Sequence, residues 1–255
     1  MQIEKFYPKS IHLNDVDSTN NYIANLVRTH QILHGTVVSA DYQHEGKGQR
    51  ATKWQSLVAQ NGLFSIYLQW NQFKINDQFQ LSMLVALSIV ACLNSESVQN
   101  VSIKWPNDIY VRDKKIAGIL IENDLCSDSI SSSIVGIGIN INQVEFALDL
   151  NATSMKLETG RSFDIQYVIQ KIGLLINELL QEFTNQPDPH PNIKDLYLKK
   201  LLGFNQIISV FENQSKLNIN ITPIDISRSG HLLALNENKE LMKYDVKEFI
   251  WTPKL

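Results

Sequence analysis

The sequence predicts an α+β fold, in which a sheet flanked by helices is followed by a small β-barrel. Two observations support this prediction. Up to about residue 202, apolar segments with the period of strands are mixed with longer segments that have the period of helices. After Gly203, short β-like runs alternate with turn residues, which is typical of a small five-stranded barrel of about 50 residues. We therefore expect a larger domain over residues 1–202 and a smaller one over 203–255.

The helices are expected from the spacing of their apolar residues. Asp17 or Ser18 can cap a first helix, because Tyr22, Ile23 and Leu26 follow at helical spacing. Helix caps are common, so capping alone explains the polar residues there. Three further helices are expected, over residues 79–95, 163–183 and 193–202.

Strands are expected on either side of the loop QHEGKGQRATKW, in TVVSADYQ and GLFSIYLQW. A strand, a turn at the proline and a hairpin that turns near residues 112–114 are expected in VSIKWPNDIYVRDKKIAGILIEN. In SSSIVGIGININ, apolar residues alternate with Gly136, Gly138 and Asn140, so one face is core and the other lacks bulky side chains. A ligand that approaches the sheet closely requires such a face. The barrel runs are IISVF, LNINITPI, HLLAL and KEFIW.

The composition is that of an ordinary soluble protein. The formal net charge is −3 at pH 7, which argues against general nucleic-acid binding. Cys92 and Cys126 have no metal-ligand spacing and are expected to be free thiols in a reducing compartment. The N-terminus resembles no signal peptide, and the longest apolar run, 81–93, is too short for a bilayer. We expect a cytoplasmic protein without membrane association.

Cations and glycines are concentrated in QHEGKGQRATKW. Backbone N–H groups near Gly46 and Gly48, together with Lys47 and Arg50, suit a bound anion. The loop matches neither a Walker A motif nor a dinucleotide fingerprint. A solvated basic loop is the alternative at this point.

Two further segments carry polar residues in an apolar context. In KWPND, Pro106 halts a strand, so Asn107 and Asp108 project at a turn, to contact a ligand or only to shape the backbone. Lys115 lies at one end of an apolar strand face, where a lysine is costly unless it meets an anion. An exposed hairpin tip would explain Lys115 equally well.

Five motifs together resemble the catalytic domain of the biotin–protein ligases, also called biotin–[acetyl-CoA-carboxylase] ligases. The resemblance covers about residues 10–145, and the C-terminal tail is similar to the family's small SH3-like domain. It implies a mixed sheet flanked by helices, the biotin–lipoate ligase fold related to class II aminoacyl-tRNA synthetases. The motifs, in order, are DSTNNY, GKGQR with its following tryptophan, KWPNDIY, KIAGILIE and GIGININ.

The resemblance implies a two-step reaction. Biotin's carboxylate attacks the α-phosphate of Mg²⁺-bound ATP to give biotinyl-5′-AMP, and a lysine of a biotin carboxyl carrier protein then attacks this anhydride and releases AMP. Two anions must be brought together and a reactive product shielded from water, which suits fixed cations in a closed site. Family members are monomers or homodimers, and the resemblance leaves this open. No metal ligand is firmly implied.

The resemblance also implies roles for individual residues. Lys115 matches the lysine that bridges biotin's carboxylate and the α-phosphate, acting as a cation and not as a nucleophile. The residues matching the biotin site are Ser18, Thr19 and Gln43 at the ureido ring, Gly46 and Lys47 over the ligand, and Gly118, Gly136 and Gly138 beside its rings and chain. The residues matching the ATP and adenylate site are Trp54 on adenine, Asn107 and Asp108 beside the adenylate, Asn140 near the phosphates and metal, Lys104 as a further phosphate contact, and Gln49 and Arg50 in the loop.

The loop departs from the usual GRGRxGRxW pattern of the family. Gln49 stands at a common arginine, Ala51 at a glycine and Thr52 at another frequent arginine. Gln49 carries no charge, so retention of the adenylate is expected to fall to Arg50 or Lys47. Ala51 costs roughly 1 kcal/mol if its position requires a positive φ.

Three alternatives bear on these expectations. The chain lacks room before the resemblance for the winged helix-turn-helix of the bifunctional repressors, so we expect a monofunctional ligase without specific DNA binding. A lipoate or octanoate ligase would share the fold and the bridging lysine, but the glycine-rich RRxSGGGxVxH segment is absent. A binding protein that keeps the biotin site without turnover is the third interpretation.

Overall fold

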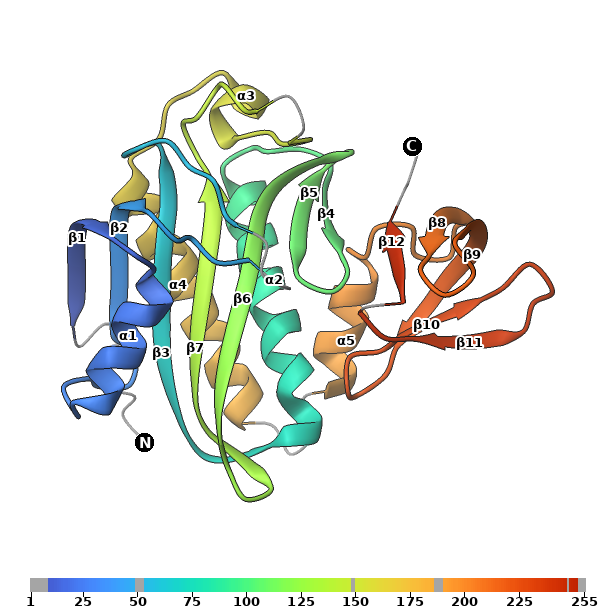
Figure 1. The fold of residues 1–255 in the computed structure, drawn as a ribbon, viewed down its shortest axis with the longest axis horizontal. Coiled ribbons are helices and arrows are strands. Elements are labelled where there is room, and N and C mark those ends of the chain that lie inside the picture. Colours follow the sequence, from blue (N-terminus) through green and yellow to red (C-terminus); the bar gives the residue numbers. More distant parts are fainter. Residues whose placement is uncertain (1–8, 49–52, 148–149, 186–189, 247, 252–255) are drawn as a thin grey trace.

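The computed structural model describes residues 9–48, 53–147, 150–185, 190–246 and 248–251 (Figure 1). Gln49, Arg50, Ala51 and Thr52 therefore lie outside the described residues. The larger sheet has seven strands in the order β1-β2-β3-β7-β6-β5-β4. Its strands are β1 (Ser10–Val16), β2 (Val37–Gln43), β3 (Asn61–Lys74), β4 (Val101–Lys104), β5 (Asp108–Val111), β6 (Lys114–Cys126) and β7 (Ser129–Asn140).

The sheet is mixed, as predicted. β1 runs parallel to β2 because the helix α1 (Thr19–Arg28) connects them as a crossover, whereas every other neighbouring pair is antiparallel. β1 was not predicted. Its sequence, SIHLNDV, is largely polar, because an edge strand has only one neighbour and is partly exposed.

Helices cover the two faces of this sheet unequally. The helices α2 (Gln78–Ser95) and α4 (Ile165–Asn185) pack against one face, over a core that includes Phe64 and Ile66. Of the helices that the structure describes, α1 alone packs on the other face, over a smaller cluster around Val38 and Tyr67 (Figure 1). Beyond α1 this second face carries Gly136 and Gly138, so room remains there for a cavity.

Residues Ile75–Ser95, the short helix η2 (Ile75–Asp77) followed by α2, are long and apolar enough to span a membrane by length and composition alone. In this fold 67% of that segment is buried against the sheet and α4. It is a core helix, more extensive than the apolar run 81–93 alone indicated.

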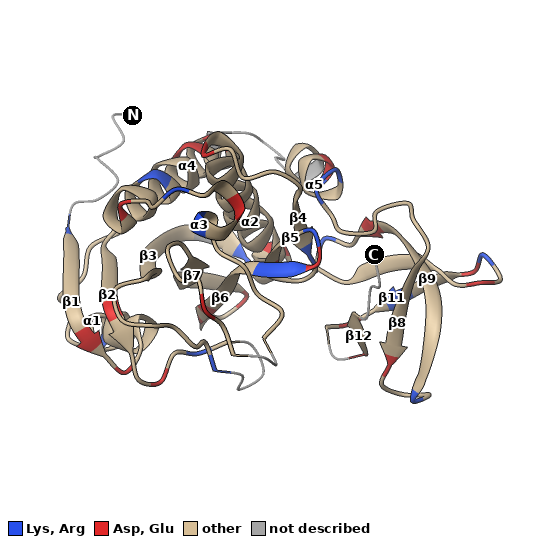
Figure 2. Cartoon of the chain, turned by 90° about the horizontal axis from the view of Figure 1, so that it is seen from above, with Lys and Arg blue, Asp and Glu red and all other residues tan. Residues whose placement is uncertain are grey.

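The C-terminal segment forms a second, antiparallel sheet in the order β11-β10-β9-β8-β12. Its strands are β8 (Ile208–Glu212), β9 (Leu217–Ile226), β10 (Leu232–Leu235), β11 (Leu241–Tyr244) and β12 (Phe249–Trp251). The sheet has the five strands that were predicted, but the segment of β11 was not identified, because its side chains are mostly exposed and alternate only weakly. Basic and acidic residues are interspersed over both sheets in Figure 2.

The remaining helices differ slightly from expectation. The helix α5 (His190–Leu198) ends before the predicted residue 202, because the chain after it bonds to β4: Ile103 N–H donates to the Lys200 carbonyl, and Leu202 N–H donates to the Ile103 carbonyl. The short helix α3 (Met155–Thr159) was not predicted; the side chain of Ser154 caps it by accepting from Leu157 N–H.

The C-terminal sheet is joined to the larger sheet through the KWPND motif. Trp105 is 2% exposed, and its indole N–H donates to the carbonyl of Gly230 over 2.8 Å. Its ring stacks on Phe249 of β12 at 5.7 Å. The two sheets are therefore neighbours at the end of β4, where the predicted site residues begin.

Candidate functional site

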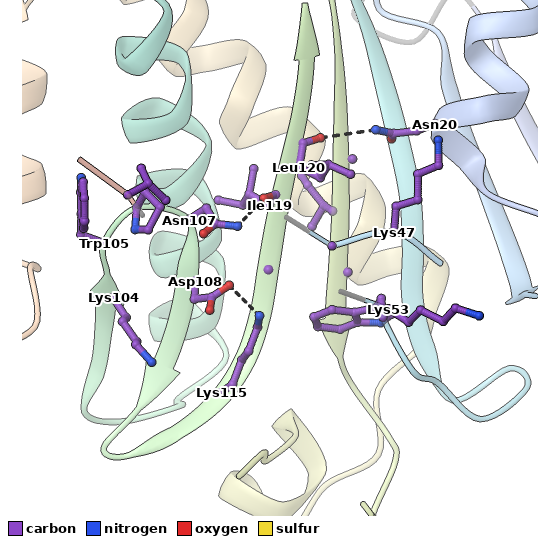
Figure 3. Close-up of a pocket in the computed structure, with 18 of the residues that line it drawn as sticks. Asn20, Lys47, Lys53, Lys104, Trp105, Asn107, Asp108, Lys115, Ile119 and Leu120 are labelled. Carbon is purple, nitrogen blue, oxygen red and sulfur yellow. Dashed lines mark hydrogen bonds and ion pairs between the residues drawn. The ribbon is translucent and has the colours of Figure 1, made fainter. Parts of the chain in front are cut away.

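A cavity of about 390 Å³ lies on the face of the larger sheet that α2 and α4 leave free (Figure 3). It extends from the start of α1 to β12 of the C-terminal sheet. Most of the predicted site residues line it, although they come from five separate motifs. These are Ser18, Thr19, Gln43, Lys47, Trp54, Lys104, Asn107, Asp108, Lys115, Gly118, Gly136 and Gly138.

Hydrogen-bonding side chains form one end of the cavity. Gln43 Oε1 accepts from the Thr19 backbone N–H at 2.8 Å and from the Thr19 hydroxyl at 3.1 Å. The Asn20 amide donates to Glu122 at 2.7 Å, and its oxygen accepts from Ser65 at 2.6 Å. These bonds fix the orientation of Thr19, Gln43 and Asn20. This end can thus recognise a polar ligand by geometry.

Ser18 occupies the N-cap position of α1, but its side chain makes no capping hydrogen bond. It is 3% exposed and lines the cavity. Ser18 therefore stands at the predicted cap position, but its hydroxyl does not cap the helix and is available to a ligand.

The glycines of β6 and β7 make room for side chains of this protein. A Cβ at Gly138 would lie 2.5 Å from the indole of Trp54, and one at Gly136 would lie 2.4 Å from the Asn20 oxygen. A Cβ at Gly118 would lie 3.1 Å from Trp54 and 3.3 Å from Lys115 Nζ. We expected this glycine face to accept a ligand directly. In the structure Trp54 and Asn20 cover part of it, so a ligand contacts their side chains as well.

Lys115 lies in the middle of the cavity and forms an ion pair with Asp108 at 2.6 Å (Figure 3). Its Nζ lies 5.5 Å from the centre of the Trp54 ring, a cation–π contact. The Lys115 backbone is held on both sides, because its N–H donates to Asn151 and its carbonyl accepts from Thr153, each at 2.9 Å. The ammonium group is therefore well positioned, and the hairpin-tip interpretation does not describe it.

Among the predicted site residues that the structure describes, two do not line the cavity. Asn140 is 4% exposed and donates to the carbonyl of Thr153 at 3.0 Å. Since Thr153 bonds to Lys115, the geometry makes Asn140 a support for the Lys115 backbone rather than a phosphate or metal contact. Gly46 is buried, and its carbonyl accepts from Trp54 N–H at 2.8 Å. It fixes the chain that carries Trp54.

Asn107 shapes the backbone and also lines the cavity. Its side chain donates to the carbonyl of Ile119 at 2.7 Å, and its carbonyl accepts from Ile119 N–H at 3.0 Å. These bonds attach the KWPND turn to β6. The residue also lines the cavity, as does Pro106.

Lys104 lies beyond Asp108, on the side away from Asn20 (Figure 3). Its Nζ donates to the hydroxyl of Tyr110 at 3.0 Å and lies 4.7 Å from the ring centre. Burial lowers the pKa of Lys104, and the nearby Lys115 lowers it further, whereas Asp108 opposes the shift. Burial also raises the pKa of Tyr110, so its hydroxyl stays protonated at neutral pH. A second lysine thus lines the cavity without an ion pair among the described side chains.

Sequence analysis missed the part of the cavity that comes from the C-terminal sheet. Val246, Phe249, Ile250 and Trp251 line it, and so does Asn20 from α1. Asn20 is adjacent to two predicted residues and could have been included from its position. Nothing in the sequence KEFIW indicated that its residues would line a cavity, because it resembles any short barrel strand.

The arrangement suits a ligand with a polar head, an apolar middle and anionic groups. The head would meet the hydrogen-bonding end, and the anions would meet Lys115 and Lys104. Among the described residues, no three His, Cys, Asp or Glu side chains are grouped as a metal site. Asp108 is the carboxylate that lines the cavity beside both lysines.

Comparisons with known proteins agree with the resemblance. Residues 13–140 match the biotin/lipoate A/B protein ligase family. The bifunctional ligase/repressor BirA of Bacillus spizizenii is 32% identical over 173 residues, which are 66% of this chain and 53% of that protein. BirA of Escherichia coli is 32% identical over 205 residues, 76% of this chain and 63% of that protein. The chain thus spans little more than half the length of these curated relatives.

A solved structure is similar over nearly the whole chain. The biotin protein ligase from Aquifex aeolicus, in complex with biotin and ATP, has a TM-score of 0.80 and 28% sequence identity. The similarity covers 97% of this chain and 100% of that one. Both sheets are therefore included in the likeness.

Proposed function

The chain belongs to the biotin/lipoate A/B protein ligase family, and we propose that it is an ATP-dependent biotin–protein ligase. It would activate biotin as biotinyl-5′-AMP and transfer the biotinyl group to a lysine of a biotin carboxyl carrier protein. The observation that carries the proposal is the placing of Lys115, a fixed cation on a glycine-lined sheet face between a hydrogen-bonding end and a second lysine. The Aquifex aeolicus protein, similar along its whole length, was solved with biotin and ATP.

The residues suggest how the first half-reaction proceeds. Biotin's ureido ring would meet Ser18, Thr19 and Gln43, which directs its carboxylate toward Lys115. A carboxylate oxygen attacks the α-phosphorus, the bond from phosphorus to the bridging oxygen breaks, and pyrophosphate leaves with the electron pair. Lys115 exchanges Asp108 for the two reacting anions and stabilises the charge that develops between them. Trp54 would provide the aromatic surface for adenine.

The second half-reaction uses the same geometry. The neutral amine of the acceptor lysine attacks the carbonyl of the anhydride, AMP leaves with the bridging oxygen, and one proton is released. Lys115 then stabilises the departing phosphate. Mg²⁺, when bound, would neutralise phosphate charge, and a single carboxylate such as Asp108 fits the usual way in which nucleotide sites hold this ion.

The test is biotinylation of a carrier domain with biotin and Mg²⁺-ATP, detected by avidin blot. Lys115→Ala is expected to lower the rate by about 100-fold or more, since it removes a preorganised charge from the transition state. Lys114→Ala is the matched control, because Lys114 is the exposed neighbour outside the cavity. Absence of a signal from the parent protein, or equal rates for the two variants, would contradict the proposal.

The family description also includes lipoate ligases, so the acid must be identified directly. The protein is incubated with labelled ATP and with biotin, lipoate or octanoate, and the adenylate is separated by chromatography. Only the biotin reaction is expected to yield an adenylate. An adenylate from lipoate would make it a lipoate ligase, and binding of biotin without any adenylate would make it a binding protein.

A further inference from the structure

An irregularity in strand β6 puts Lys115 on the cavity face of the sheet (Figure 3). Ile109 of β5 pairs with Ala117 of β6, but the next residue of β5, Tyr110, pairs with Lys115. Ile116 is therefore an extra residue without a counterpart in β5, which makes this point a β-bulge. Both Ile116 and Ala117 are 0% exposed and belong to the core. The bulge thus turns two successive side chains to the core and leaves Lys115 on the opposite face.

A regular ladder between β5 and β6 would place Lys115 elsewhere. Without the extra residue it would pair with Val111, which is 1% exposed and belongs to the core, instead of with Tyr110. A shift of one residue turns the side chains of a strand to the opposite face of the sheet. The ammonium group would then point away from Asp108 and the cavity. The groups that hold the bulge therefore also hold Lys115 at the site.

A segment that follows β7 supplies this support. β7 ends at Asn140, and residues 151–153 pair in parallel with Lys115 beyond that end. Both backbone hydrogen bonds of Lys115 go to this segment. Within it, the Thr153 carbonyl accepts from the Asn140 side chain, and the Thr153 hydroxyl donates to Glu158 at 2.7 Å. Thr153 is 2% exposed, so solvent does not replace these bonds.

Glu158 connects the segment to the turn that precedes Lys115. Its side chain is 12% exposed and lies on the short helix α3. One carboxylate oxygen accepts from the Thr153 hydroxyl, and the other accepts from Arg112 at 2.8 Å, in the turn between β5 and β6. The carboxylate is thus bonded to the chain on both sides of Lys115. Neither Thr153 nor Glu158 lines the cavity, so their bonds act on the protein and not on a ligand.

We propose that Thr153 and Glu158 are positioning residues, which hold the bulge of β6 and thereby keep the Lys115 ammonium group on the cavity face. The inference rests on the proposed function, in which Lys115 stabilises the charge between the two reacting anions. A displacement of about 1 Å in a site can cost 100-fold in rate, so a small relaxation of the bulge is sufficient to slow the reaction. The two residues contact neither substrate, and they therefore affect the rate at saturating substrate rather than the binding of biotin.

The experiment compares Thr153→Val, which keeps the shape of the side chain but removes its hydroxyl, with Thr153→Ser, which retains the hydroxyl. The initial rate of biotinyl-5′-AMP formation is measured at saturating biotin and Mg²⁺-ATP. Thr153→Val is expected to lower this rate about tenfold, the value of a hydrogen bond to a charged group, and to change the KM for biotin by less than about twofold. Thr153→Ser should stay within about twofold of the parent.

Ser132→Ala is the matched control for loss of a buried hydroxyl. The Ser132 hydroxyl donates to the Asp124 carboxylate at 3.0 Å, in the half of β7 that is remote from Asn140. Its loss should leave the rate within about twofold of the parent. A tenfold loss in Ser132→Ala as well would overturn the proposal, because any loosening of the sheet would then have the same effect. A Thr153→Ser protein as slow as Thr153→Val would also overturn it.

A double-mutant cycle with Lys115→Ala separates positioning from general damage. If Thr153 acts through Lys115, Thr153→Val should cost less than about twofold once the lysine is absent, measured by prolonged incubation with labelled ATP. A tenfold loss in both backgrounds, or an unchanged rate in Thr153→Val alone, would contradict the inference. If Thr153→Val does not fold, Glu158→Ala replaces it, with the same expected loss and the same cycle. A parent protein that forms no adenylate would overturn the proposed function, whereas an active parent with unaffected variants overturns this inference alone.

Discussion

Replacing Gly138 by alanine tests whether the glycine face exists to seat the indole of Trp54. The added Cβ would lie 2.5 Å from the indole, whereas carbon atoms pack at about 3.5–4.0 Å. The ring must therefore move by roughly 1 Å, which displaces it from Lys115. Misplacement of about 1 Å in a site can cost up to 100-fold in rate, so we expect adenylate formation to fall by 10- to 100-fold. Stability should change by less than about 1 kcal/mol, because the indole lies at a cavity wall.

The assay is the initial rate of biotinyl-5′-AMP formation from labelled ATP, measured in a double-mutant cycle with Trp54→Ala. Without the indole, the alanine methyl group at position 138 meets open space. We therefore expect Gly138→Ala to cost less than about threefold in the Trp54→Ala protein. The same loss in both backgrounds would refute the reasoning, since the indole would not then be the reason for the glycine.

Gly62→Ala provides a contrast on the opposite face of the sheet. A Cβ there would lie 2.8 Å from Ile139 Cγ2, in the core beside Ile141 and Ile169. Overpacking of a core costs about 1–3 kcal/mol, so urea denaturation should show a clear loss of stability. If Gly138→Ala instead lowered the stability and Gly62→Ala did not, the two faces of the sheet would have been assigned wrongly.

Two predictions concern groups outside the cavity. Burial raises the pKa of the Cys92 thiol to about 12, so Ellman's reagent at pH 8 should titrate one thiol, the exposed Cys126, and a second only in urea. The hydrogen bond from Lys171 is the main cause that lowers the pKa of Glu96 below its ordinary 4.5. This pair therefore stabilises the fold above pH 4.5 and is lost as the pH falls through the lowered value; Lys171→Met should cost up to about 1 kcal/mol at pH 7 and less in acid, by urea denaturation.

Much of the larger sheet could be predicted because its strands are either buried on both faces or alternate cleanly. The alternation in β7 placed Val135 and Ile137 in the core and the glycines on the other face, and the structure confirms this. The polar edge strand β1 and the exposed β11 carry no such pattern, because partial burial imposes little selection for apolar side chains.

The candidate site was predictable where one short motif holds the interacting groups. Lys104, Asp108 and Lys115 lie on the consecutive antiparallel strands β4, β5 and β6, so their proximity follows from local pairing. The bond from Asn20 to Glu122 spans 102 positions, and the bond from Trp105 to Gly230 spans 125. Contacts of that kind depend on how whole elements pack, and no local periodicity encodes them.

Lys104 and Lys115 differ in a way that only the structure reveals. Lys115 has a carboxylate at 2.6 Å, which holds its ammonium group in place before any ligand enters. Lys104 has a hydroxyl instead, and burial disfavours its charge. An arriving anion must compete with Asp108 for Lys115, but it meets no such competitor at Lys104. The polyphosphate is therefore expected to engage Lys104 first, and this contact would guide the α-phosphate toward Lys115 for the reaction.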